Sequence, residues 1–131
     1  MKRNALVLVL CALALAGCVC RPTVPESTNP QVAVIGDRLI VVSPEPLVFL
    51  SDQRDAWITW HLPKGSKFRF GQEGIVIEKG GDEFVKCGPR EEGLAFACLN
   101  RHTRKGTYKY TVNLHAGEKR LAPLDPTIYN E

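Results

Sequence analysis

After residue 30, apolar side chains recur at every second position, and this alternation limits the chain to one fold class. In the longest example, the segment TYKYTVNLHAG, one face of an extended strand carries four apolar side chains: Tyr108, Tyr110, Val112 and Leu114. Turn signals separate such runs roughly every 8 to 12 residues, as in sandwiches and barrels. No window in this part of the chain has a convincing period of 3.6 residues. The sequence therefore predicts an all-β fold of about seven or eight short strands.

The segment Gly106 to Val112 resembles the penultimate strand of immunoglobulin-like and fibronectin-like domains. In those folds a tyrosine near the start of this strand packs its ring inward and hydrogen-bonds the preceding loop, an arrangement called the tyrosine corner. The resemblance assigns that role to Tyr108 and implies an antiparallel, immunoglobulin-like β-sandwich. Trp60 would be the core tryptophan of an earlier strand. The proline-containing last segment, residues 121–131, suits an edge strand or a strapped tail.

A basic and then apolar segment opens the chain. Lys2 and Arg3 precede about a dozen apolar residues, Ala5 to Ala16, whereas a helix that spans a membrane needs roughly 20. The length and the flanks are those of a secretory signal.

The end of this run, Leu15-Ala16-Gly17-Cys18, resembles the lipobox of bacterial lipoproteins. The resemblance implies cleavage before Cys18 and acylation of its sulfur and its amine, and two or more acyl chains make membrane attachment durable. Val19 follows the anchor where an Asp would signal the inner membrane. The resemblance therefore places the protein in the outer membrane of a Gram-negative bacterium, facing the periplasm. Ordinary cleavage that leaves a free thiol at Cys18 is the alternative.

These features predict three segments. Residues 1–17 form the signal peptide, and residues 18–30 form a lipidated N-terminus and flexible tether, because RPTVPESTNP is too poor in apolar residues to offset the entropy of ordering. Residues 31–131 form the β-sandwich domain. Loss of the signal leaves 15 basic residues against 14 acidic ones, so charge gives no argument for nucleic-acid binding.

Three cysteines follow Cys18 in the mature chain. Cys87 and Cys98 enclose GPREEGLAFA, in which Gly and Pro mark a turn between two apolar runs. Because cysteines pair in an oxidising compartment, the sequence predicts a Cys87–Cys98 disulfide that closes a hairpin. In the chain-entropy model, a disulfide that closes a loop of this size stabilises the fold by roughly 3 kcal/mol. Two buried thiols are the alternative, and Cys20 is left without a partner.

The chain offers no catalytic motif: it has neither Gly-x-Ser-x-Gly nor a glycine-rich phosphate loop. His61, Cys98 and His102 resemble the ligand order of cupredoxins, which are also β-sandwiches. A blue-copper site usually has an axial Met as well, and the only Met is Met1. The predicted disulfide would also remove the Cys98 thiolate. We therefore expect no enzymatic activity, no metal and no cofactor, with a copper-binding cupredoxin relative as one alternative.

Two features indicate a binding surface. The loop NRHTRKG gathers four basic side chains that would meet an acidic surface: Arg101, His102, Arg104 and Lys105. Trp57 faces away from the core side of its strand, and exposed aromatic residues are favoured contact residues. A solvated turn and packing beneath a loop are the ordinary explanations of these two features.

The sequence as a whole thus predicts a lipid-anchored, non-catalytic domain that contacts the membrane through its anchor and binds envelope proteins or glycans. A periplasmic inhibitor or immunity protein, which blocks an enzyme with a protruding loop, is the alternative function.

Overall fold

A computed structural model describes residues 26–131. The predicted signal peptide, the lipid anchor Cys18 and the unpaired Cys20 lie outside the described residues. Within them the chain forms strands and one short 3₁₀ helix, and no helix is long and apolar enough to cross a membrane. The elements are β1 (Gln31–Ile35), β2 (Leu39–Ser43), β3 (Leu47–Phe49), β4 (Ala56–His61), β5 (Ile75–Ile77), β6 (Phe84–Arg90), η1 (Glu91–Gly93), β7 (Ala95–Asn100), β8 (Gly106–Val112), β9 (His115–Ala116), β10 (Lys119–Arg120) and β11 (Thr127–Asn130).

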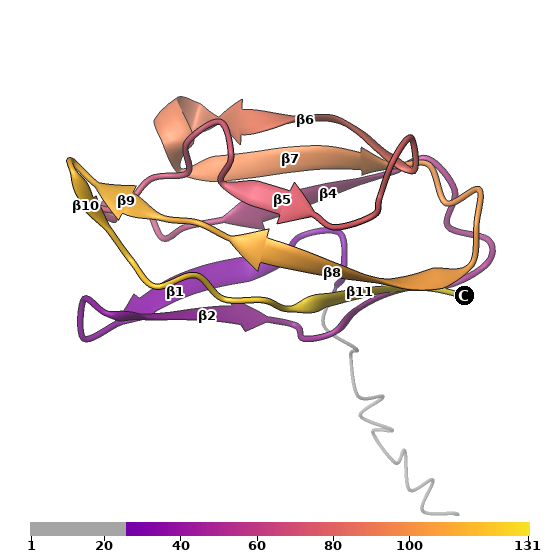
Figure 1. The fold of residues 1–131 in the computed structure, drawn as a ribbon, viewed down its shortest axis with the longest axis horizontal. Coiled ribbons are helices and arrows are strands. Elements are labelled where there is room, and N and C mark those ends of the chain that lie inside the picture. Colours follow the sequence, from indigo (N-terminus) through magenta and orange to yellow (C-terminus); the bar gives the residue numbers. More distant parts are fainter. Residues whose placement is uncertain (1–25) are drawn as a thin grey trace, which may run out of the picture.

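The strands form two main sheets, and the prediction of an all-β sandwich is confirmed (Figure 1). The five-stranded sheet has the order β2-β1-β4-β7-β6, and the four-stranded sheet has the order β3-β11-β8-β5. Strands β9 and β10 form a separate hairpin at the end opposite the C-terminus (Figure 1). The neighbours β4-β7-β6 and β5-β8-β11 reproduce the B-E-D and C-F-G orders of an immunoglobulin-like sandwich. Strand β8 occupies the penultimate position that the sequence resemblance gave it.

The sheets are mixed, whereas the sequence predicted antiparallel pairing throughout. Strand β1 pairs in parallel with β4, and β3 pairs in parallel with β11. The segment Ser43–Pro46 causes part of this difference, because prolines cannot donate to a strand ladder. The apolar run therefore divides into β2 in one sheet and β3 in the other. The expectation of an edge strand at the C-terminus was wrong, because β11 lies between β3 and β8.

The core lies between the two sheets and centres on aromatic side chains. Trp60 is fully buried, as predicted, and its ring centroid lies 5.4 Å from that of Tyr110. Tyr108, the expected corner tyrosine, is only partly buried and packs edge-on against Phe84 with the centroids 5.0 Å apart. Its hydroxyl has no hydrogen bond to the preceding loop among the described residues. Tyr108 therefore has part of the inward packing of a tyrosine corner but lacks its hydrogen bond.

The Cys87–Cys98 disulfide is present and joins neighbouring strands β6 and β7. The register passes from Val85 opposite Leu99 to Gly88 opposite Ala97, which leaves two β6 residues facing Cys98. This bulge gives β6 the extra residue that places Cys87 across from its partner. The predicted hairpin disulfide is confirmed, and the Cys98 end of it is buried in the core.

The folded part begins before residue 31, where the sequence placed its boundary. The backbone N–H of Val48 donates to Ser27 Oγ at 2.8 Å. The N–H groups of Thr59 and His61 donate to the carbonyl oxygens of Thr28 and Pro30 at 2.8 and 3.0 Å. Residues 27–30 are therefore held against β3 and β4, since the edge of β4 supplies the backbone partners that composition alone does not reveal.

Candidate functional site

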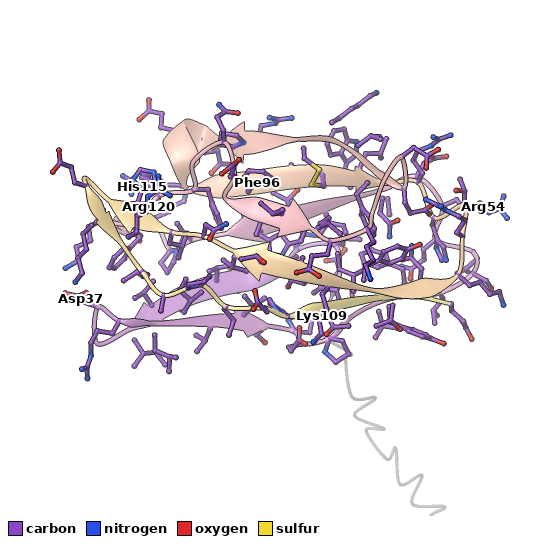
Figure 2. All side chains as sticks on the ribbon, viewed as in Figure 1. Asp37, Arg54, Phe96, Lys109, His115 and Arg120 are labelled. Carbon is purple, nitrogen blue, oxygen red and sulfur yellow. A yellow bond between two sulfur atoms is a disulfide. The ribbon has the colours of Figure 1, made fainter. Side chains whose placement is uncertain are left out.

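Connecting segments gather at two opposite ends of the sandwich. We call the end built by residues 50–55, 79–83 and 101–105 the closed end, and the end built by residues 63–74, 91–94 and 113–121 the open end. Arg54 lies at the closed end, and His115 and Arg120 lie at the open end (Figure 2). The predicted binding residues belong to the closed end.

A buried carboxylate organises the closed end. Glu83 has no exposed surface. Its carboxylate accepts hydrogen bonds from the hydroxyl of Thr103 at 2.6 Å, from the backbone N–H of Thr103, and from the N–H and Nε of Arg104 at 3.3 and 3.4 Å. Burial by itself would raise the pKa of Glu83, but the hydrogen bonds from Thr103 and Arg104 hold this pKa below its usual value. The carboxylate therefore stays ionised and fixes the loop after β7.

His102 is buried at 5% exposure, which corrects the expectation of a solvated basic residue. Its Nδ1 lies 3.0 Å from the backbone oxygen of Gln53, and its Nε2 lies 3.1 Å from a backbone oxygen of Glu131. Both ring nitrogens therefore face polar groups of the protein. His102 therefore ties loop 50–55 to the end of β11 and does not face a partner.

A pair of buried amides joins the two sheets beside His102. Asn100 of β7 donates to Asn130 Oδ1 at 2.8 Å, and Asn130 of β11 donates back to Asn100 Oδ1 at 3.2 Å. The backbone N–H of His102 also donates to Asn100 Oδ1, at 3.1 Å. Both amides are fully buried, so the closed end satisfies its polar groups internally.

The remaining cations of the predicted basic loop are largely paired within the protein. Arg104 Nη2 lies 3.1 Å from Asp82 Oδ1, and Arg101 Nη1 lies 3.7 Å from Asp82 Oδ2. Lys105 is exposed and has no ion pair among residues 26–131. The loop thus presents less free charge than its sequence suggests.

Trp57 is 44% exposed, as expected, and lies on the outer face of the five-stranded sheet. It stands opposite Leu99, which in turn stands opposite Val85, so three apolar side chains form a row across β4, β7 and β6. The structure therefore brings Trp57 together with apolar neighbours more than with the basic loop.

The cupredoxin alternative is not supported by the positions of its three residues. Cys98 is bonded to Cys87, and both ring nitrogens of His102 face backbone oxygens. The third residue, His61, has its Nε2 3.4 Å from Asn29 Oδ1. In the part of the chain that the structure describes, no group of three or more His, Cys, Asp or Glu is arranged to hold a metal ion.

The open end contains two pockets, of about 790 and 490 Å³, that meet at shared residues. Gly71, Gln72 and His115 line both pockets. The larger pocket extends between residues 71–74 and the β9–β10 hairpin, and the smaller one extends towards the turn after β6. Three loops far apart in the sequence thus build one surface, with His115 at its centre.

Charged side chains surround these pockets without pairing to each other. Glu73, Glu118 and Arg120 line the larger pocket, and Arg90 and Glu91 lie along the smaller one. Within residues 26–131 none of them forms an ion pair within 4 Å, whereas Asp82 at the closed end pairs with two arginines. The open end therefore offers donors and acceptors of both signs to a polar partner.

Sequence reasoning did not find the open end. Its residues have no recognisable spacing, because they come from three separate loops, and His115 has no neighbouring residue of ligand type in the sequence. The only local signals are the turn glycines, such as Gly93 and Gly117, whose φ angles of 84° and 59° suit a residue without a Cβ. No protein-family model matches the chain, and no curated protein matches it.

Proposed function

We propose that this protein is a lipid-anchored, non-catalytic binding module of a Gram-negative cell envelope. Acylated Cys18 would hold it in the outer membrane, facing the periplasm, and the open end would contact an envelope protein or glycan. The anchor is supported by the lipobox-like end of the leader, Leu15-Ala16-Gly17-Cys18.

The single observation that supports the binding role is the pair of pockets that share Gly71, Gln72 and His115. Clefts of several hundred Å³ with a few convergent polar groups are the usual form of binding sites. Loop surfaces on a rigid sandwich also suit recognition, because the sheets fix the loops while their sequences vary freely.

The residues around the pockets favour binding over nucleophilic catalysis. Covalent hydrolysis requires a nucleophile within hydrogen-bond reach of a base. The residues that line the two pockets include no Ser, Thr or Cys. His115 Nδ1 lies 3.3 Å from the carbonyl oxygen of Gly117, in its own hairpin.

The anchor is tested by the mass of the mature protein. We expect the purified membrane form to begin at Cys18 and to carry the mass of its acyl chains, and we expect Cys18→Ala to be unprocessed or soluble. A membrane-bound, correctly cleaved Cys18→Ala protein would contradict the anchor.

The binding surface is tested by affinity capture from an envelope extract with two matched variants. Arg120→Ala removes an exposed cation from the open end, and Lys105→Ala removes one from the closed end. We expect wild type and Lys105→Ala to capture the same protein or glycan and Arg120→Ala to capture less of it. Loss with Lys105→Ala alone would instead identify the basic loop as the site. Capture of an enzyme that loses its activity would support the inhibitor alternative.

A further inference from the structure

The outer face of the five-stranded sheet, which we call the five-stranded face, carries no acidic side chain at its registered positions. Strand alternation and register identify these positions, with Ile35 opposite Leu39 at one end and Trp57 opposite Leu99 towards the other. The only residues there with a titratable or charged side chain are His61 and Arg90. A face exposed only to water in an antiparallel sandwich normally carries polar residues at these positions.

Three large side chains of this face are open to solvent. Ile35 is 58% exposed, Leu39 is 56% exposed and Trp57 is 44% exposed. Ala33 and Val41 form the next opposite pair along the β1–β2 ribbon, so its outer surface is apolar over both pairs. Ile35, Leu39, Ala33 and Val41 thus lie together in one apolar patch, and a contiguous exposed apolar patch can mark an interaction site.

The outer face of the four-stranded sheet provides the contrast. Its centre carries Thr107, Lys109, Thr111 and Thr127. Lys109 Nζ donates to Thr127 Oγ1 at 3.0 Å, and Thr111 Oγ1 donates to Asp125 at 2.9 Å. The centre of that face hydrogen-bonds within itself, and its exposed apolar side chains are Val76 on β5 (42%) and the neighbours Tyr129 (44%) and Val48 (38%) on β11 and β3. Both faces therefore expose large apolar side chains, and the five-stranded face carries the two most exposed ones of residues 26–131, Ile35 and Leu39.

Basic side chains surround the tip of the β1–β2 ribbon. Arg38 lies in the turn, and Lys67 and Lys119 approach the same turn. The acid at the tip, Asp37, is paired with Lys67 at 2.5 Å, and Lys119 Nζ donates to the Asp37 carbonyl oxygen at 3.3 Å. The tip thus combines exposed apolar side chains with a net excess of cations, which complements a surface of anionic headgroups.

The start of the described chain contacts both sheets. Ser27 Oγ accepts a hydrogen bond from Val48 of β3, and the carbonyl oxygens of Thr28 and Pro30 accept hydrogen bonds from β4, so the chain passes from the edge of the four-stranded sheet to the five-stranded sheet. Seven residues lie between Cys18 and Glu26, so eight residue steps join them. A chain can cover at most about 3.6 Å per step, which puts Cys18 within about 29 Å of Glu26. A bilayer that holds Cys18 would therefore lie within reach of this sheet.

We infer that the five-stranded face rests on the surface of a lipid bilayer. Ile35 and Leu39 lie at the boundary between headgroups and acyl chains, Trp57 lies among the headgroups, and Arg38 and Lys119 contact anionic lipid. This inference rests on the lipid anchor of the proposed function. The loops of the open end to which Lys67 and Lys119 belong would then lie next to the membrane surface.

Fluorescent labels on two matched positions test this orientation. The protein is the lipidated full chain with Cys20→Ala, reconstituted into vesicles of phosphatidylethanolamine and phosphatidylglycerol. One version carries Leu39→Cys on the five-stranded face, and the control carries Val76→Cys on the opposite sheet. Both native side chains are exposed, so neither change disturbs the core. We expect aqueous iodide to quench the label at residue 39 at least about twofold less than the label at residue 76, and doxyl-labelled lipid to quench only the former.

The possible results separate the inference from the function on which it rests. Protein that floats with the vesicles while iodide quenches both labels equally would overturn the orientation and leave the anchor intact. Protein that does not float would overturn both. Protection of residue 39 that persists in detergent without vesicles, together with a dimeric mass, would show that a second copy covers the face and would also overturn the inference.

Discussion

The two ends of the sandwich use the same residue types in opposite ways. At the closed end Glu83, His102 and Arg104 bond to groups within the protein. At the open end His115 and Arg120 line a pocket of about 790 Å³, where His115 contacts only Gly117 of its own hairpin through Nδ1 and Arg120 forms no ion pair within residues 26–131. The comparison shows that residue type alone does not distinguish a structural polar group from a binding group. Burial and the presence of an internal partner make the distinction.

This difference has an energetic consequence. A buried charged group that loses its partners retains the cost of its removal from water, whereas an exposed group exchanges a protein contact for water at little cost. Substitutions at the closed end should therefore change stability, and those at the open end should change binding alone. The predictions below test this division from the largest effect to the smallest.

Glu83→Ala should have the largest effect. It removes the buried carboxylate that accepts four hydrogen bonds from Thr103 and Arg104. We expect a loss of about 3–5 kcal/mol in the free energy of unfolding, because several hydrogen bonds to one charged group, each of about 1.5–3 kcal/mol, are lost together. Chemical denaturation measures this loss. The matched control is Glu73→Ala at the open end, and a comparable loss in both variants would contradict the division between the ends.

The buried role of Glu83 could not be predicted from the sequence. Asp82 and Glu83 are adjacent acids in a turn, and such pairs are usually solvated. Their partners Thr103 and Arg104 follow about twenty positions later and meet Glu83 only when β6 and β7 pair. The alternation of apolar residues predicted strands, but it carries no information about which loops meet at one end of a sandwich.

The burial of His102 had a signal in the sequence. Phe96, Cys98 and Asn100 alternate on the inner face of β7, and His102 continues this period of two. The interpretation of residues 100–106 as one basic loop grouped its side chains by charge and ignored this alternation. The strands, the hairpin disulfide and the exposure of Trp57 followed from local pattern, whereas the pockets depend on loop conformations that no local pattern specifies.

Asn130→Ala should have the second largest effect. It removes one member of the buried amide pair that links β7 to β11 and leaves a buried Asn100 amide group unpaired. We expect a loss of about 1–3 kcal/mol in the free energy of unfolding, as for other buried polar groups left without a partner. Thermal or chemical denaturation measures the loss. Asn113→Ala provides the control at the open end, since Asn113 is half-buried and bonds only the Glu73 carbonyl oxygen. Equal losses would argue against a special role for the closed end.

Acid should weaken the closed end through Glu83. Because its folded-state pKa is held below the ordinary value of 4.5, the carboxylate stabilises the fold fully above that value. This contribution is lost as the pH falls from about 4.5 through the lower folded-state pKa. The Glu83→Gln variant should be less stable at neutral pH and should lose less stability than wild type between neutral and acidic pH. Denaturation curves of both proteins at several pH values test this prediction. If wild type and Glu83→Gln lost the same free energy of unfolding on acidification, carboxylates other than Glu83 would be responsible for the loss.

Arg120→Ala should have the smallest effect on stability. Arg120 is exposed in β10 and forms no ion pair among the described residues, so water replaces its contacts. We expect the free energy of unfolding to stay within about 0.5 kcal/mol of wild type, as for most surface substitutions. The same variant should capture less partner from an envelope extract, so a stability measurement and a capture measurement on one protein separate folding from binding. A large loss of stability would mean that the open end is a structural element, and the capture result would then no longer identify a binding surface.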